Sequence, residues 1–174
     1  MEGKGLFKYS LISFCVGLVP IFIMFSIYFS TPDSPIILNL FAYAEGHARS
    51  FSDQHLQIST IASAYTKIAP CFVVLMYLLC WNKFNIETIN LDIRQWLKLF
   101  PVLVVFTIGI YALLYIGTTD LSTSSRKSLR LVAQNEYLLM FYYMGIYLAN
   151  YFFIWLFLFY CYPLKALPIF KKRD

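Results

Sequence analysis

Apolar residues in this chain gather into four long runs that polar segments separate. The runs cover about residues 11–29, 61–81, 97–116 and 138–162. The last run contains no charged residue between Glu136 and Lys165. A helix rises about 1.5 Å per residue, so about 20 apolar residues cross a hydrocarbon core of roughly 30 Å. The pattern therefore predicts four transmembrane helices, and we expect them to pack as a single membrane domain over residues 1–174.

Lys and Arg residues are distributed unevenly over the segments between these runs. Nine of the 14 fall in the N-terminal segment, the second connection taken through Lys98 and the C-terminal segment, four fall in the first and third connections, and Lys67 lies within the second run. Basic residues are enriched on the cytoplasmic side of membrane proteins. The sequence therefore predicts an all-α integral membrane protein with four transmembrane helices and both termini in the cytoplasm.

Two of the connections contain shorter patterns with a helical period. After Ser34 and Pro35, apolar residues recur on one face until Gly46, which predicts a short amphipathic helix on the membrane surface. In the third connection, apolar residues share one helical face and basic residues share the opposite face. The basic residues are Arg126, Lys127 and Arg130. We expect this second helix to lead into the fourth span and to contact lipid phosphates.

The composition agrees with a membrane protein. The chain is 60% hydrophobic and 20% aromatic with 13% charged residues, and its mean hydropathy is +0.65. A soluble domain of this length cannot bury so much apolar surface, so lipid must be its solvent. The net charge of +5 does not indicate nucleic-acid binding, because the basic residues lie beside apolar runs and form no face of their own.

The candidate chemistry of the chain is sparse. None of the four runs contains Asp, Glu or His, so the intramembrane carboxylate of a proton-coupled transporter is missing. The sequence also lacks GxSxG, HExxH, P-loop and GxGxxG patterns. His47 and His55 have poor spacing for a metal site, and we interpret them as solvated loop residues. We predict no catalytic, cofactor or metal site.

The four cysteines also argue against an enzyme that oxidises thiols. Such a membrane enzyme needs cysteine pairs exposed at the outer face. Cys15, Cys71, Cys80 and Cys161 all fall in the apolar runs, and no two of them form a CxxC pair. Cys71 and Cys80 are separated by about 13.5 Å of helix rise, which no disulfide spans. We interpret the cysteines as small buried apolar residues.

A lysine inside a membrane span needs a physical reason. Lys67 lies in the second run, three residues before Pro70. Insertion of a charged residue at the centre of a span costs about 2.5–3.5 kcal/mol. Either the side chain extends so that its ammonium reaches the headgroups, or the ammonium makes a polar contact within the bundle or with a membrane partner. The sequence leaves both alternatives open.

Several short motifs occur in a fixed order through most of the chain. They are GLVP at 17–20, TPD at 31–33, KIAP at 67–70, DLST at 120–123, Arg130-Leu131 with Asn135, and Lys171-Lys172-Arg173 after the aromatic last run. Together they resemble the immunity proteins that protect bacteria from pore-forming colicins of the A type. The usual Lys-Thr-Ala-Pro and Glu-Leu-Thr-Thr of that family appear here as KIAP and DLST, which keep size and charge roughly in place.

The resemblance implies a small protein of the bacterial inner membrane with four helices and both ends in the cytoplasm. It also implies that the chain binds the membrane-inserted, hydrophobic helical hairpin of a colicin's pore-forming domain and prevents the channel from opening. No enzyme activity, cofactor or nucleic acid enters this prediction. The competing class is a small channel or transporter, or a subunit of a larger membrane complex, and flux in vesicles or a co-purifying partner would distinguish these.

Recognition between helices already in the bilayer depends on fit and polar contacts, since burial from water adds little there. We therefore hypothesise a groove on the last span with a polar rim at the outer face. The groove residues are Tyr143, Gly145, Tyr147, Asn150 and Trp155. The rim residues are Lys67, Asp120, Arg126, Lys127 and Arg130. Each has internal packing or lipid contact as its alternative role, and the small-xxx-small pair Gly145 and Ala149 serves either internal packing or a homodimer.

Overall fold

The computed structural model of this chain describes residues 3–80 and 93–161. The elements in chain order are α1 (Gly3–Ser30), α2 (Pro35–Ala44), β1 (Ser50–Phe51), a 3-10 turn η1 (Asp53–His55), α3 (Leu56–Thr66), α4 (Ala69–Cys80), α5 (Ile93–Tyr115), β2 (Thr119–Asp120), α6 (Lys127–Gln134) and α7 (Glu136–Cys161). The predicted end of the second span at Trp81, most of the second connection, and the basic tail Lys171–Arg173 lie outside the described residues.

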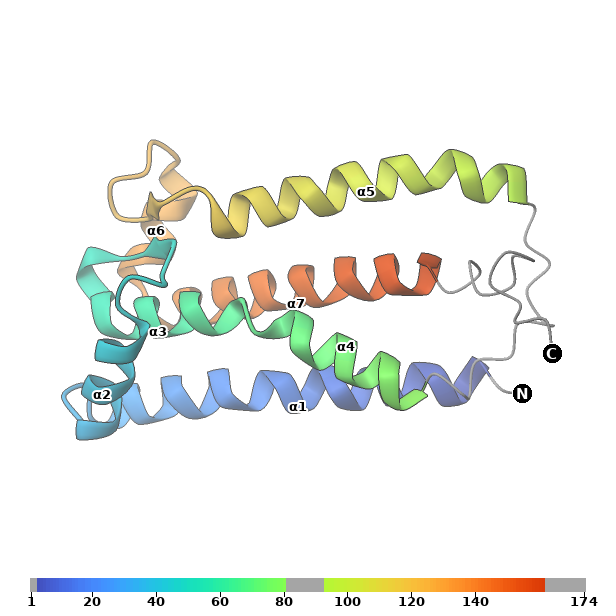
Figure 1. Cartoon of the computed structure of the whole chain (residues 1–174). Helices are drawn as coiled ribbons and strands as arrows, with labels where there is room; N and C mark the ends of the chain where they lie inside the picture. The colour runs from blue at the N-terminus through green and yellow to red at the C-terminus, as the bar shows by residue number, and fades with distance from the viewer. Residues whose placement is uncertain (1–2, 81–92, 162–174) are drawn as a thin grey trace.

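The long helices run side by side along one axis, as Figure 1 shows. Three segments are long and apolar enough to cross a membrane, namely Lys8–Ser30, Asp53–Leu79 and Glu136–Leu158. Within α5, the apolar segment Phe100–Ala112 is shorter. The chain is thus mainly helical with three candidate membrane-spanning helices, and the fourth crossing stays a prediction.

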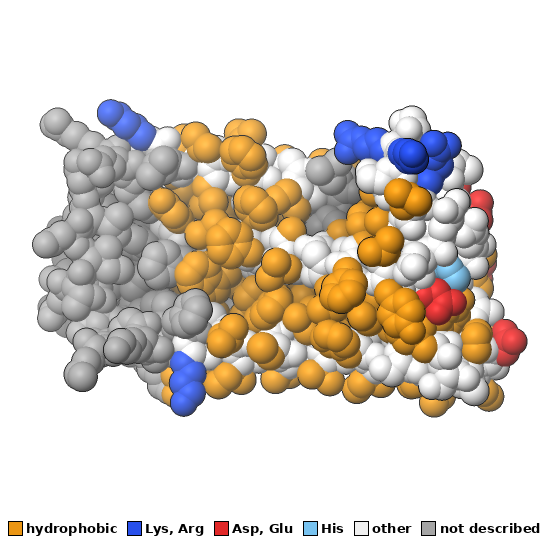
Figure 2. Space-filling view, turned by 180° about the vertical axis from the view of Figure 1, so that it is seen from behind, with side chains coloured by type: hydrophobic (Ala, Val, Ile, Leu, Met, Phe, Trp, Pro, Cys, Tyr) orange, Lys and Arg blue, Asp and Glu red, His pale blue; other side chains and the backbone are white. Residues whose placement is uncertain are grey.

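The surface has the distribution of side chains that a bilayer requires. Figure 2 shows hydrophobic side chains across the middle of one face, with basic side chains towards both ends of the molecule. Large apolar residues are exposed on the long helices, including Val16, Leu75, Val105 and Phe141. Exposed apolar residues in such a belt find their favourable solvent in lipid tails.

The core lies between α1, α4 and α7, while α5 packs mainly against α7. Ile21, Phe25, Val73 and Tyr147 are fully buried there. A Cβ atom built on Gly17 would lie 1.8 Å from the hydroxyl oxygen of Tyr147. Only glycine therefore lets α1 approach the Tyr147 ring this closely, which gives the GLVP motif a packing role.

The second apolar run is broken between α3 and α4, and the break follows from Pro70. Pro70 has no N–H, so the carbonyl of Thr66 loses its helical donor four residues on. The side chain of Asn150 in α7 donates an Nδ2–H to this carbonyl at 3.0 Å. Tyr115 of α5 likewise donates its O–H to the carbonyl of Lys67 at 3.1 Å. Neighbouring helices thus satisfy two carbonyls at the break, as a helix in lipid requires.

The structure has a helix at both places where an amphipathic helix is predicted, while their contacts with the membrane surface and with lipid phosphates stay predictions. In α2, Ser34 caps the first turn by accepting a hydrogen bond from the Ile37 N–H at 3.3 Å, and Gly46 follows the helix with a φ of +82°. In α6, Ala133 is buried, whereas Lys127 and Arg130 are exposed. Asn135 then begins α7, since its Oδ1 accepts hydrogen bonds from the backbone amides of Tyr137 and Leu138.

The first and third connections cover the end of the bundle that carries α2 and α6 (Figure 1), and we call this part of the chain the cap, residues 31–55 and 117–135. Its centre is a short parallel pairing of β1 with β2, in which Ser50 lies opposite Thr119. Two backbone hydrogen bonds hold the pairing, from Thr119 to the Arg49 carbonyl at 2.6 Å and from Leu121 to the Phe51 carbonyl at 2.8 Å. The first and third connections are therefore one structure, although about 70 residues separate them.

Candidate functional site

The DLST motif forms a self-contained turn in the cap. Asp120 accepts hydrogen bonds from the Ser122 N–H at 2.8 Å and from the Thr123 O–H at 2.7 Å. Slight burial raises the pKa of the Asp120 carboxyl, but these donors outweigh it and hold the pKa below its usual value. Leu121 is fully buried beneath the turn. The Asp120 carboxylate, predicted as a rim residue, therefore shapes the loop on which it lies.

Serine side chains join this turn to the first connection. The Ser122 Oγ accepts a hydrogen bond from the Asp53 N–H at 3.0 Å. Ser52 donates its O–H to the Ala133 carbonyl at 2.9 Å, which ties the first connection to α6 as well. The sequence gives no signal for the role of these serines, because serine is common in any solvated loop.

A second layer of the cap lies closer to the bundle. The Ser63 Oγ accepts hydrogen bonds from the backbone amides of Arg49 and Ser50, at 3.0 and 3.1 Å. Tyr143, which is fully buried in α7, donates its O–H to the Ser50 carbonyl at 2.9 Å. Tyr143 therefore connects the longest apolar run to the cap instead of facing outward.

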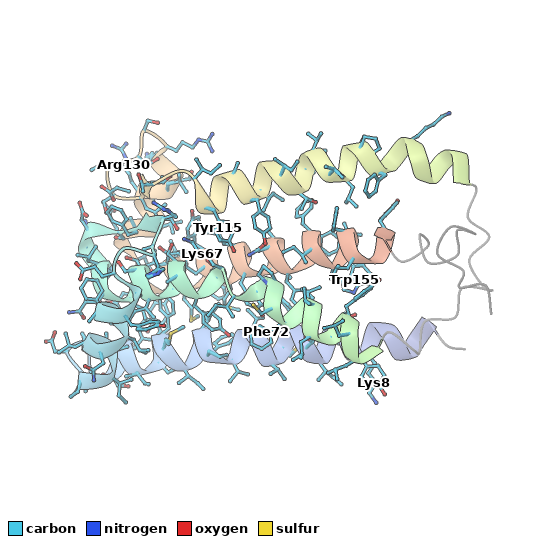
Figure 3. The ribbon with its side chains drawn as sticks, in the orientation of Figure 1. Lys8, Lys67, Phe72, Tyr115, Arg130 and Trp155 are labelled. Carbon is cyan, nitrogen blue, oxygen red and sulfur yellow. The ribbon has the colours of Figure 1, made fainter. Side chains whose placement is uncertain are left out.

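Lys67 lies at the break between α3 and α4. Its ammonium donates a hydrogen bond to the backbone carbonyl of His47 at 2.5 Å. The same nitrogen lies 5.1 Å from the centroid of the Tyr115 ring, within the range of a cation–π contact. Figure 3 shows Lys67 and Tyr115 near each other between α3 and α5. Of the two alternatives for Lys67, the structure has the polar contact within the protein.

The other predicted rim residues are accessible. Arg126, Lys127 and Arg130 are all exposed on the cap. Figure 2 shows a group of basic side chains at this end of the molecule, and Figure 3 labels Arg130 there. These three residues and the turn at Asp120 lie in the same cap, whereas Lys67 lies beneath it.

The predicted groove residues occupy three different environments. Tyr143, Tyr147 and Asn150 are at most 1% exposed and lie in the core. Trp155 is half-buried and donates its indole N–H to the Ser10 Oγ of α1 at 2.9 Å. Gly145 is exposed, with no described atom within 4 Å of where its Cβ would lie. The structure therefore groups the tyrosines and Asn150 in the interior, and it leaves Gly145 on the surface of α7.

A cavity of about 460 Å³ lies beneath the cap, lined by α3, α5, α6, α7 and the two outer connections. Arg49 and Arg126 are its basic residues, and none of the described residues that line it is Asp or Glu. The Nε of Arg49 is buried and has no hydrogen-bond partner among the described residues. In the sequence, Arg49 is one isolated charge in a long loop, so no local pattern indicates its place in the cavity.

Comparison with known proteins adds the decisive observation. The family model for the colicin immunity protein matches residues 33–174, which include every described element after α1. The chain belongs to the colicin immunity protein family. It is also similar to the Colicin-A immunity protein of Citrobacter freundii, with 26% identity over 159 residues that cover 91% of this chain and 87% of the relative. No solved structure matches the chain.

Membership of the colicin immunity family agrees with the family resemblance and with the function class predicted from the motifs. Proteins of this family confer bacteriocin immunity and are protective binding proteins, not enzymes. The family implies a colicin as the partner. The membrane association of such proteins agrees with the three apolar helices of this chain. In this member of the family, the KIAP, DLST and Asn135 motifs lie at the helix break, the cap turn and the start of α7.

Two interpretations of single residues in this colicin immunity protein were wrong. His55 is not a solvated loop residue, because its Nδ1 lies 3.2 Å from the Tyr28 hydroxyl and 3.6 Å from a carboxylate oxygen of Glu136. Cys15 and Cys71 lie on helices as expected, but both are free and exposed instead of buried. Exposure of a small apolar side chain to lipid costs no free energy, so a cysteine on a membrane-spanning helix need not face the protein interior. Among the described residues, no cluster of His, Cys, Asp and Glu is suited to hold a metal ion.

Proposed function

We propose that this immunity protein binds the membrane-inserted pore-forming domain of a colicin in the bacterial inner membrane and prevents its channel from opening. The observation that carries the proposal is the family match over residues 33–174. The relative from Citrobacter freundii is named for immunity to colicin A, and we extend that type of target to this chain. The partner is the hydrophobic helical hairpin of the toxin, and this protein would bind the hairpin within the bilayer.

We propose four crossings with both termini in the cytoplasm. The start of α1 and the end of α7 lie at the same end of the bundle (Figure 1), which fits an even number of crossings. The 23 residues of α5 extend over about 35 Å, long enough for the fourth crossing. Nine of the 14 basic residues belong to the N-terminal segment, the second connection and the C-terminal segment of the sequence, which supports the assignment of these segments to the cytoplasm. The polar cap then faces the periplasm, from which a colicin arrives.

The recognition surface we propose combines an exposed rim with the outer side of α7. Arg126, Lys127 and Arg130 are exposed on the cap and can attract acidic residues at the tip of the hairpin. Gly145 offers a place where a helix backbone can approach α7 closely, for a hairpin helix or for a second copy of this chain. The buried members of the predicted groove act indirectly, because Tyr143, Tyr147 and Asn150 hold α7 in position beneath the cap. The half-buried Trp155 acts in the same way at the opposite end of α7, through its bond to α1.

A killing assay tests the proposed target. Sensitive bacteria that express the chain would be challenged with a panel of pore-forming colicins, and with a nuclease colicin that uses the same receptor. Survival against one or two pore-forming colicins with continued killing by the nuclease is expected, because the block acts at the pore-forming domain. Equal survival against both kinds of toxin would place the block at the receptor or at uptake and would refute the proposal. Solute flux through vesicles that contain the purified chain would favour a channel or transporter instead.

A charge-removal variant tests the rim. Replacement of Arg126, Lys127 and Arg130 together by Gln should weaken protection while the protein still inserts at its normal level. Lys8→Gln, at an exposed basic residue at the other end of the bundle, is the control for loss of surface charge. Full protection by the triple variant at normal protein level would remove these residues from the recognition surface.

A further inference from the structure

The cavity beneath the cap has an excess of positive charge that nothing in the described protein balances. Arg49 and Arg126 line it, and the ammonium of Lys67 lies close enough to Arg49 for the two charges to repel each other. None of the described lining residues is acidic, and the buried Nε of Arg49 has no partner. A buried guanidinium donor without an acceptor is costly, and an anionic oxygen is the acceptor that satisfies it best.

The lining also supplies neutral donors beside the arginines. Thr119, Ser124 and Ser125 place hydroxyl-bearing side chains on the wall that the outer connections form. Hydroxyl and guanidinium groups together are the usual partners of phosphate oxygens, and a planar guanidinium can bind two of them at once. The polar wall of the cavity therefore fits a phosphate group.

The opposite wall is apolar and extends into the membrane-spanning part of the bundle. It is formed by Ile110 of α5 together with Ile146 and Ala149 of α7. Ala149 is 13 residues from Glu136 at the start of α7, which is about 20 Å of helix rise. A ligand that fills the cavity is thus polar at the level of the cap and apolar below it.

We infer that this cavity is a binding site for an anionic phospholipid of the outer leaflet, with its phosphate between Arg49 and Arg126 and the upper part of one acyl chain between α5 and α7. The volume agrees, since about 460 Å³ lies within the range of pockets for small ligands. One turn of a helix with its side chains occupies about 400–600 Å³ by its diameter and rise. A helical hairpin does not fit the cavity, so its ligand differs from the colicin, although Arg126 belongs both to the cavity and to the proposed rim.

A lipid in this cavity would have a role in the packing of α5. Among the described long helices, α5 packs mainly against α7. A lipid held between the cap, α5 and α7 would fill space that protein side chains leave open, and it would bridge both helices to the cap. Arg49, which the sequence presents as an isolated loop residue, becomes the central phosphate ligand.

Binding of a defined lipid to the full-length protein tests the site. Protein purified in mild detergent would be delipidated and titrated with a short-chain phosphatidylglycerol, with native mass spectrometry as the readout. We expect binding of one lipid per chain, and a loss of affinity of about tenfold or more in Arg49→Gln and in Arg126→Gln, because each removes a charge-assisted hydrogen bond. Arg130→Gln removes the same charge from a residue that does not line the cavity, and its affinity should stay within about twofold.

A second pair of variants tests the apolar wall without a change in charge. Ala149→Leu adds bulk to the cavity, whereas Gly145→Leu adds bulk to the same helix at a place with open space around it. Loss of lipid binding in the first variant alone supports the site, and it does so even if the Arg49 variant fails to fold. Equal effects of Ala149→Leu and Gly145→Leu, or of Arg126→Gln and Arg130→Gln, would overturn it.

The same titration separates the sources of the anion. Inorganic phosphate should compete with the lipid only weakly, since it lacks the acyl chain that contacts the apolar wall. Binding of inorganic phosphate as tight as that of phosphatidylglycerol would overturn the lipid assignment. Binding of phosphatidylcholine equal to that of phosphatidylglycerol would overturn the preference for an anionic headgroup. None of these measurements uses a colicin, so their outcome is independent of the proposed function.

Discussion

Replacement of Asn150 by Leu tests whether α7 stabilises the break between α3 and α4. Asn150 is 1% exposed, and its Nδ2–H donates to the Thr66 carbonyl at 3.0 Å. Pro70 has removed the backbone donor that would otherwise serve this carbonyl. Leucine is close to asparagine in shape, so the change removes the hydrogen bond with only a modest change in packing.

The expected loss follows from three terms. A hydrogen bond between membrane helices is worth about 0.6 kcal/mol on average and up to about 1.7 kcal/mol. A buried carbonyl left without a donor costs about 1–3 kcal/mol. Removal of the Asn150 Oδ1, which is buried without a partner among the described residues, returns part of that cost. The net loss in the free energy of unfolding is about 1–2 kcal/mol, which raises the unfolded fraction about 5- to 30-fold.

A double-mutant cycle with Pro70→Ala isolates the physical reason. Alanine restores an N–H at position 70, so the Thr66 carbonyl regains a helical donor and no longer depends on Asn150. Unfolding in mixed micelles, followed by circular dichroism, would give the four free energies. Asn150→Leu should cost at least about 1 kcal/mol less in the Pro70→Ala background than in the parent. The exposed Asn39→Leu change is the control for residue type. An equal loss in both backgrounds would refute the proposed pairing.

Three further predictions concern the core and the cap. Gly17→Ala should lower the free energy of unfolding, because its Cβ would meet the Tyr147 hydroxyl, and Tyr147→Phe in the same chain should recover part of the loss. Tyr147→Phe alone should leave stability unchanged or higher, since this buried hydroxyl has no partner among the described residues. The Asp120 pKa in the folded protein lies below its unfolded value of 3.8, so the stability that the turn contributes is present above pH 3.8 and lost as the pH falls through the folded pKa. Acid titration should show this loss of stability in the parent and not in Asp120→Asn. Ser122→Ala should speed hydrogen exchange of the β1 and β2 amides, while Ser128→Ala on the exposed side of α6 should not; equal exchange in the two variants would argue against the serine link.

Local pattern was sufficient to predict α2, α6 and the apolar runs of the long helices, but not the break between α3 and α4. The spacing of apolar and basic residues in the third connection is enough to predict α6, in which Ala133 is buried and Lys127 and Arg130 are exposed. The Ser34-Pro35 start and the Gly46 stop of α2 likewise follow from backbone chemistry within one turn. These features depend on neighbours in sequence, which is why the sequence alone contains them.

The candidate site was predicted only in part, because its contacts join distant segments. Arg126, Lys127 and Arg130 are accessible as expected, but Tyr143 and Asn150 donate their hydrogen bonds to the Ser50 and Thr66 carbonyls. A transmembrane helix is apolar on every side, so its period does not tell the face that meets protein from the face that meets lipid. The interpretation of His55 was wrong because it also depends on a distant segment: its partner Tyr28 is 27 residues away in the sequence.

The sequence by itself determined the membrane as solvent, the apolar runs, the two amphipathic helices and the motifs that carry the family resemblance. These properties are sums over consecutive residues, and each segment possesses them without the others. The tertiary structure alone decided that the first and third connections form one cap, that α5 and α7 satisfy the broken α3–α4 helix, and that Arg49 lines a cavity whose described walls carry no anion. Each of these depends on which helices lie side by side, and in lipid that order is set by close packing and a few polar contacts instead of by hydrophobicity.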